Sequence, residues 1–295
     1  MKDISDKDKY PAELRKKLES FYSGKKFYDG LLHESCEHAE ECWKRLENKV
    51  KDASEWNFFS LPYIGKKYNG KLVCVGLNVH EGGGRNLQEM QIRGIKAFKT
   101  DKKCHKNDIY GDKYDPGVIE SLERGCKSVK FENGMKKMGV SYGGTLLWHR
   151  IAVYSKILLD GYNSNVADNF KELAEIYEHI IYMDAIKCSP ARNRSKPTRK
   201  MEKDCPEYIF FKELKIIKPK NILIMSKPVA RLMMENYKPI GRSEDFPRSG
   251  KDVDHCKIKI EEGNVDVYYV VHPGTRGRGS RTDLFQELAN IIPKK

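Results

Sequence analysis

The alternation of short apolar runs with segments of helical periodicity is the feature that most constrains the fold of this chain. The first run, Lys71–Leu77, is rich in β-branched residues and ends at a glycine-rich turn, as is typical of a buried parallel strand. Three more apolar runs follow, at His179–Ile186, Asn221–Met225 and Val265–Val271. Strands that alternate with helices form parallel sheets covered on both faces. The sequence therefore predicts an α/β fold, with three αβα layers around a central, mainly parallel four-stranded sheet.

The segments between these runs have apolar residues at helical spacing. The expected helices are Leu146–Leu159, Asn169–Glu178, Pro206–Ile217, Pro228–Tyr237 and Asp283–Ile291. A further run, Lys257–Ile260, is expected to pair with Val265–Val271 as a hairpin whose second arm enters the core.

Two parts of the chain differ from this alternation. Residues 1–65 are polar and have two helical stretches, one with Leu14, Leu18, Phe21 and Tyr22 and a second at about Cys36–Leu46. Residues 86–138 are charged and rich in Lys, Gly and Asp, as expected of an insertion that lies across a surface. We therefore expect an N-terminal helical extension over 1–65 and an α/β domain over 66–295, with an insertion at about 86–138.

The charge balance indicates a partner. The chain has 55 Lys and Arg against 42 Asp and Glu, which gives a net charge of +13. A positive field of this size attracts phosphate-rich molecules, so nucleic acid is the leading class of partner. The alternative is a lysine-rich surface that serves only solubility.

The N-terminal residues contain no apolar stretch of signal-peptide length, and no later run is long enough to span a bilayer. We expect a soluble, cytoplasmic, monomeric protein that does not bind membranes. The chain has eight cysteines. In a reducing compartment a chain of this size does not need a disulfide framework, so metal ligation or burial must explain them.

Ligands of parallel sheets bind beyond the carboxyl ends of the strands, and the most unusual motifs of this sequence lie there. Lys187-Cys188 follows an expected strand and leads into Arg192-Asn193-Arg194, and Cys205-Pro206 opens the next helix. This segment resembles the iron–sulfur branch of the uracil-DNA glycosylase superfamily, which has Lys-Cys, prolines, Asn-Arg and a second Cys at almost this spacing. Lys218-Pro219-Lys220 and the apolar run after it match the continuation of that motif.

The resemblance implies a four-cysteine [4Fe-4S] cluster, since such clusters need thiolates from separate segments. The implied ligands are Cys36, Cys42, Cys188 and Cys205. The spacing between Cys36 and Cys42 is wider than in the family, so zinc is an alternative metal, and free thiols are the alternative without a metal. Around the second cysteine pair, DNA contacts are expected from Arg192, Arg194 and Lys196.

Two further motifs match the superfamily. Gly76-Leu77-Asn78 ends the first strand, where the resemblance implies that Asn78 positions the attacking water and that Gly76 and Leu77 border the base. The iron–sulfur branch has Glu at the place of Leu77, so this motif is more like the mismatch-specific and single-strand-selective branches. His272-Pro273 follows the last strand, and the family's His contacts the leaving base. The alternatives are a plain glycine-rich turn and a structural histidine.

The remaining candidates come from the same resemblance. The loop after His272 carries Arg276, Arg278 and Arg281 between glycines, which suits close approach to phosphates. Tyr142 lies in a glycine-rich segment before a Leu-Leu helix, where the family has an aromatic ring that stacks on the flipped base. A core tyrosine is the alternative.

Asp184 stands where uracil-specific relatives have an Asn that reads the base edge. An ionised carboxylate only accepts hydrogen bonds, so it favours a base edge that offers two donors. If burial keeps Asp184 protonated, it can donate as Asn does, and uracil would again fit.

The motif order predicts a DNA glycosylase of base excision repair that flips a damaged or deaminated base and hydrolyses its N-glycosidic bond. The alternative is a catalytically silent nucleic-acid-binding protein that retains the fold and the metal, which the residues at Leu77 and Asp184 favour. A third class is a nucleotide-handling hydrolase that acts on free nucleosides.

Overall fold

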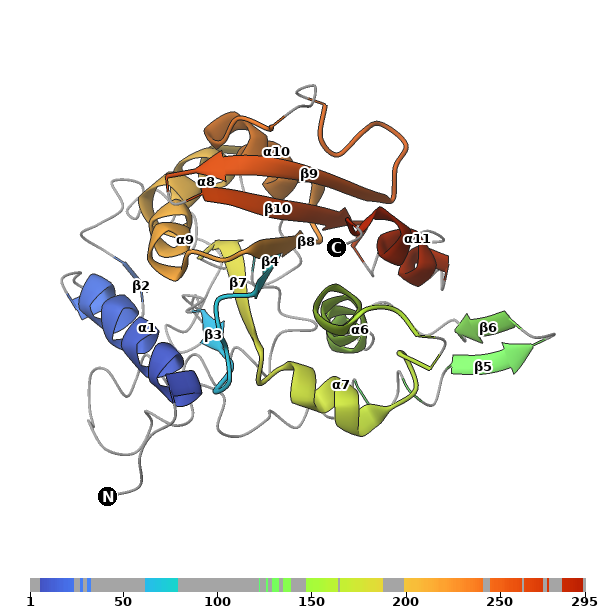
Figure 1. The fold of residues 1–295 in the computed structure, drawn as a ribbon. Coiled ribbons are helices and arrows are strands. Elements are labelled where there is room, and N and C mark those ends of the chain that lie inside the picture. Colours follow the sequence, from blue (N-terminus) through green and yellow to red (C-terminus); the bar gives the residue numbers. More distant parts are fainter. Residues whose placement is uncertain are drawn as a thin grey trace, which may run out of the picture.

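The computed structural model describes residues 6–23, 27–28, 31–32, 62–78, 122, 126, 129–132, 135–138, 147–163, 165–187, 199–240, 245–261, 263–272, 275 and 283–293. Helices and strands alternate over most of these residues (Figure 1). The helices are α1 (Asp6–Ser23), α6 (Leu147–Asp160), α7 (Phe170–Ile176), α8 (Arg199–Cys205), η2 (Pro206–Phe210), α9 (Phe211–Ile217), α10 (Lys227–Asn236) and α11 (Asp283–Ile291). The strands are β1 (Phe27–Tyr28), β2 (Leu31–Leu32), β3 (Tyr63–Ile64), β4 (Leu72–Asn78), β5 (Val129–Glu132), β6 (Met135–Met138), β7 (Ile180–Ile186), β8 (Asn221–Ile224), β9 (Val253–Ile260) and β10 (Gly263–Val270).

The central sheet has six strands in the order β3-β7-β4-β8-β10-β9. Pairing is parallel between β7 and β4, between β4 and β8, and between β8 and β10, whereas the edge strands β3 and β9 pair antiparallel. The α/β class is confirmed, but the expectation of four strands is corrected to a six-stranded mixed sheet. The sequence prediction missed β3 because two residues are too few for a periodicity, and it shortened β9 to its last four residues.

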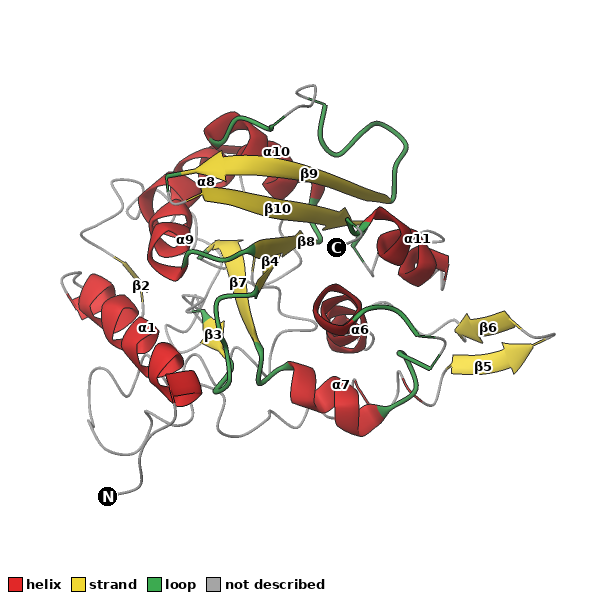
Figure 2. Cartoon of the chain, in the orientation of Figure 1, coloured by secondary structure: helices red, strands yellow, loops and turns green. Residues whose placement is uncertain are grey.

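Helices lie on both sides of this sheet (Figure 2). Along β4, Val73 and Val75 face a core that also contains residues of α1, α9 and α10. Leu72 and Cys74 face a second core built with α6, α7 and α11. This alternation is the period-two pattern of a strand that is buried on both faces. Cys74 is fully buried in this second core, so its side chain contributes to packing.

The segment before α9 differs from the sequence prediction, which began a helix at Pro206. The structure adds α8 ahead of that residue, and η2 is a π-helical turn between α8 and α9. Proline has no backbone N–H and disrupts the ordinary hydrogen bonds of a helix interior. The wider turn accommodates it: the N–H of Phe211 donates to the carbonyl of Pro206, five residues earlier.

The N-terminal helix belongs to the packed core. Leu14 and Leu18 of α1 are 3% and 2% exposed and lie in the core on the α9 side of the sheet. The hydroxyl of Tyr10 donates to the carbonyl of Ile217 at the end of α9, at 3.2 Å. The helical expectation is confirmed for this stretch, whereas the expected stretch at Cys36–Leu46 lies outside the described residues. Of the expected insertion at 86–138, the structure describes residues 122 and 126 and the hairpin of β5 and β6.

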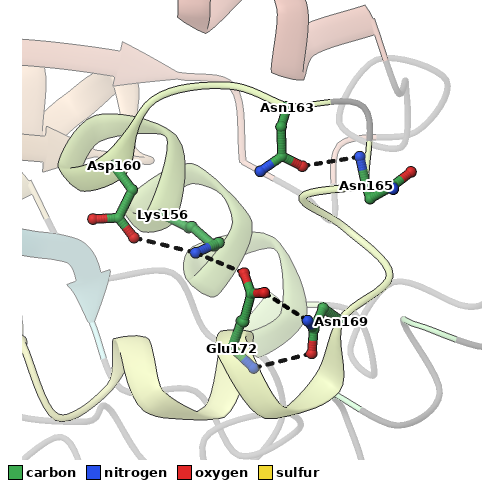
Figure 3. Close-up of polar contacts among 6 residues, drawn as sticks. All are labelled: Lys156, Asp160, Asn163, Asn165, Asn169 and Glu172. Carbon is green, nitrogen blue, oxygen red and sulfur yellow. Dashed lines mark hydrogen bonds and ion pairs between the residues drawn. The ribbon is translucent and has the colours of Figure 1, made fainter.

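A polar network joins α6 to α7 (Figure 3). The ammonium group of Lys156 lies 3.1 Å from a carboxylate oxygen of Asp160 and 2.8 Å from one of Glu172. Burial by itself would lower the pKa of Lys156, but its hydrogen bonds to Glu172 and Asp160 raise the pKa overall. Asn169 caps α7 by accepting the backbone N–H of Glu172 at 3.3 Å. The network fixes the start of α7, which leads directly into β7.

Among the described helices, none is both long and apolar enough to cross a membrane.

Replacement of Leu18 by Ala tests the docking of α1. Removing a buried leucine side chain leaves a cavity, so we expect the free energy of unfolding to fall by about 2–5 kcal/mol. Chemical denaturation measures this change. Lys17→Ala, at an exposed position of the same helix, is the control and should have little effect. Equal stabilities of the two variants would mean that α1 does not contribute to the core.

Candidate functional site

The inner strands end at one edge of the sheet, which we call the carboxyl edge. It comprises the ends of β4, β7, β8 and β10 and the residues that directly follow them. Because these strands are parallel, the three motifs that the sequence singled out all reach this edge. One strand, β8, separates β4 from β10, so Asn78 and His272 end strands about 10 Å apart by ordinary strand spacing. This is the edge at which ligands of open α/β sheets bind.

Asp184 and Gly76 are brought together across neighbouring strands. They are partners in the register of β7 and β4, and Asp184 is 3% exposed. A Cβ atom on Gly76 would lie 2.5 Å from the Oδ1 atom of Asp184 and 2.5 Å from the hydroxyl of Tyr182. A side chain at position 76 would therefore displace Asp184 or Tyr182, whereas glycine leaves both in place. Two of the residues predicted to border the base thus form one cluster.

Tyr182 completes this cluster, and the sequence analysis missed it. Its hydroxyl donates to Oδ1 of Asp184 at 3.2 Å. Burial, and then the charge and hydrogen bonding of Asp184, raise the pKa of Tyr182 well above its ordinary value, so the phenol keeps its proton. Its ring packs edge-on against Trp148 of α6, with ring centroids 5.0 Å apart. The period-two spacing from Asp184 is the signal that could have identified Tyr182.

A buried ion pair lies at the end of β7. The ammonium nitrogen of Lys187 is 2.6 Å from a carboxylate oxygen of Glu213 on α9, and both side chains are fully buried. Burial raises the pKa of Glu213 well above its ordinary value. Glu213 occupies a helical position between the buried residues Phe210 and Ile217, where an apolar side chain is expected. That mismatch is the sequence signal for this pair, which we did not predict.

Cys205 lies beside the same strand end. Its sulfur accepts the backbone N–H of Lys187 at 3.3 Å, and the residue is 8% exposed. Lys187 precedes Cys188 in the sequence, so one predicted metal ligand contacts the residue next to another. Within the part of the chain that the structure describes, no group of three or more His, Cys, Asp or Glu side chains could hold a metal ion.

His272 and Leu77 have different surroundings at this edge. His272 is exposed, directly after β10, and its carbonyl accepts the N–H of Thr275 at 2.9 Å. Leu77 is partly buried and packs against the core on the α9 side of the sheet. His272 thus lies at the surface of this edge, whereas the Leu77 side chain contributes mainly to packing.

A segment that the sequence analysis did not consider also reaches the carboxyl edge. Because β9 is antiparallel, its beginning lies beside the end of β10, where the N–H of Val271 donates to the carbonyl of Asp252 at 2.7 Å. The nearby guanidinium group of Arg248 lies 2.9 Å from the fully buried carboxylate of Asp254. This contact fixes the position of a partly exposed cation close to the strand end that precedes His272.

The remaining predicted site residues lie outside the described part of the chain. They are Cys36, Cys42, Tyr142, Cys188, Arg192, Arg194, Lys196, Arg276, Arg278 and Arg281. Asn78 ends β4, and its side chain is likewise outside the described part.

Comparison with known proteins adds no assignment: no protein-family model matches the chain, and no curated protein matches it.

Single and paired replacements of Lys187 and Glu213 test the buried ion pair. Lys187→Met leaves an uncompensated buried carboxylate, so we expect a loss of about 3–5 kcal/mol in the free energy of unfolding. The paired variant Lys187→Met with Glu213→Met should recover most of this loss, because no charge is then left buried.

Chemical denaturation of the single and paired variants measures both effects. Lys215→Met is the control, since Lys215 lies on the same helix in an exposed ion pair with Glu261 at 3.1 Å. Exposed pairs contribute little to stability. A paired variant as unstable as the sum of the two single variants would show that the charges do not stabilise each other.

Proposed function

We propose that this chain is a DNA glycosylase that flips a damaged or deaminated base out of DNA and hydrolyses its N-glycosidic bond. The observation that carries the proposal is the parallel pairing of β7, β4, β8 and β10. It puts the ends of the strands that bear Asn78, Asp184 and His272 at one edge of the sheet. In this proposal the four inner strands and the helices on both faces correspond to the three-layer αβα fold of the uracil-DNA glycosylase superfamily.

The chemistry assigns a role to each strand end. A base within the duplex is shielded, so it must leave the stack before its glycosidic bond can be attacked. Negative charge then develops on the departing base, and His272, exposed beyond β10, donates a hydrogen bond to it. Asn78 holds the water that attacks the sugar carbon. Asp184 reads the edge of the base.

The residues at the end of β7 suit a cluster ligand at position 205. The Cys205 sulfur is nearly buried and accepts a backbone N–H, and such hydrogen bonds to sulfur tune iron–sulfur clusters. Cys36, Cys42 and Cys188 would be the other ligands. When bound, the [4Fe-4S] cluster would order the segment between Cys188 and Cys205. Zinc held by the same thiolates is the alternative.

DNA is the proposed partner, and the net charge of +13 supports it. The second candidate function is nucleic-acid binding without catalysis. The packing of Leu77 against the core favours it, because the iron–sulfur branch has a Glu at that position. The product distinguishes the two functions: an abasic site indicates the enzyme, whereas a band shift without base release indicates the binding protein. A hydrolase of free nucleosides would instead act on those substrates without DNA.

Replacement of Asp184 by Asn tests the base-reading role. Asn can donate to a carbonyl oxygen and accept from a ring N–H, whereas an ionised carboxylate only accepts. We therefore expect Asp184→Asn to shift base release towards uracil and away from bases with two donors. The assay is the release of uracil, hypoxanthine, xanthine, modified cytosines and 8-oxoguanine from duplex and single-stranded DNA, and 8-oxoguanine is the base with adjacent N–H and amino donors.

Asn165→Asp, at an exposed turn that follows α6, serves as a control for the exchange of carboxamide and carboxylate. Unchanged relative rates for Asp184→Asn would remove this residue from base recognition. The absence of any released base would favour the binding function.

Anaerobic purification followed by visible absorbance and iron, sulfide and zinc analysis tests the metal centre. We expect brown protein with bound iron and sulfide, and we expect Cys205→Ser to lower the bound metal because one thiolate is lost. Cys256→Ser replaces a buried cysteine of β9 and is the matched control, which should keep its metal. A Cys205→Ser variant with its full metal content would exclude Cys205 as a ligand.

A further inference from the structure

The contact between Tyr182 and Asp184 has a defined direction. Both residues project from the same side of β7, two positions apart, and the phenol oxygen is 3.2 Å from Oδ1 of the carboxylate. The phenol keeps its proton, since burial first, and then the neighbouring Asp184, raise the pKa of Tyr182. A protonated phenol beside an ionised carboxylate can only be the donor. The contact therefore stabilises the ionised form of Asp184.

The surroundings hold this contact in place. The ring of Trp148 packs edge-on against the ring of Tyr182, at 73° between the ring planes. On β4, a side chain at Gly76 would overlap both the phenol oxygen and Oδ1. Tyr182 is thus packed from α6 and β4 at the position where its hydroxyl reaches the carboxylate. A carboxylate has two oxygen atoms that can each accept more than one hydrogen bond, so a bond to Tyr182 is compatible with further donors.

We propose that Tyr182 is the positioning residue that sets base selectivity, by orienting Asp184 and holding it in the acceptor form. The inference rests on the proposed glycosylase function and deepens it by naming the substrate class. That class is a base with adjacent N–H and amino donors on the edge that faces Asp184, as in guanine-type lesions. Uracil presents one N–H and a carbonyl oxygen, which an ionised carboxylate repels.

Loss of the Tyr182 hydroxyl favours the donor form of Asp184 over the acceptor form. In Tyr182→Phe, the buried carboxylate loses a hydrogen bond to its charged form, which favours protonation. A protonated Asp184 can donate to a carbonyl oxygen, as the Asn of uracil-specific relatives does. Tyr182→Phe and Asp184→Asn therefore act in the same direction, although only one of them alters the carboxyl group.

The test is a double-mutant cycle. It compares the native chain, Tyr182→Phe, Asp184→Asn and the double variant, each purified anaerobically at full length. The rates of uracil and 8-oxoguanine release from duplex DNA are measured for each, because 8-oxoguanine carries the adjacent N–H and amino donors. We expect Tyr182→Phe to raise the ratio of uracil to 8-oxoguanine release by about tenfold or more, as befits a hydrogen bond to a charged group. In the Asp184→Asn background the same replacement should leave the ratio unchanged, because no carboxylate remains.

Two further variants separate selectivity from packing. Tyr63→Phe removes another buried tyrosine hydroxyl, from the residue that pairs with Tyr182 across β3 and β7, and should leave the ratio unchanged. Replacement of Tyr182 by 3-fluorotyrosine keeps the ring but makes the phenol a stronger donor. It should lower the ratio of uracil to 8-oxoguanine release, and it gives a result even where Tyr182→Phe does not fold.

The outcomes distinguish this inference from the proposed function. Base release with the same ratio for the native chain, Tyr182→Phe and the 3-fluorotyrosine variant overturns the role of Tyr182 and leaves the glycosylase intact. An equal effect of Tyr182→Phe with and without the Asp184 carboxylate also overturns it, since the effect would then be one of packing. No release of any base by the native chain overturns the proposed function itself.

Discussion

The burial of β4 on every side is the constraint on which the rest of the structure depends. This strand pairs in parallel with β7 on one side and β8 on the other, and both of its faces are covered by apolar cores. A parallel strand in this position satisfies its backbone groups only if its neighbours are in register. The inner strands therefore all end at the carboxyl edge of the sheet, and the residues that follow them lie close together there.

The charged side chains that are buried near the end of β7 must be compensated within the protein, because little water reaches them. Asp184 accepts from Tyr182, and Lys187 is paired with Glu213. The first contact joins two positions of β7, and the second joins the end of β7 to α9. Each contact therefore also fixes the relative position of the residues that it joins. The pairing of Lys187 holds α9 against the end of β7, and the backbone of Lys187 binds the sulfur of Cys205. Such groups are costly to bury alone, which is why the partners are required.

This arrangement connects packing to the proposed chemistry. In the proposed enzyme, the carboxylate that reads the base must be held in one orientation. Tyr182 donates to Asp184, Gly76 leaves room for both side chains, and Trp148 packs against the ring of Tyr182. The π-helical turn η2 begins directly after Cys205 and lies against the same strand. In the proposed enzyme, the last residues of β7 thus hold both Cys205, the metal ligand, and Asp184, the residue that reads the base.

The local sequence determined the elements whose pattern repeats within a few residues: the strand cores of β4, β7, β8 and β10, the helix around Leu14 and Leu18, and the helices α6, α7, α9, α10 and α11. It also marked Asp184 and Gly76, through motif order. Only the tertiary structure decided what those residues touch. The pairing of β3 and the contacts of Asp184 with Gly76 and of Lys187 with Glu213 join residues far apart in sequence. No local period encodes such contacts, because burial and register are set by the whole packed chain.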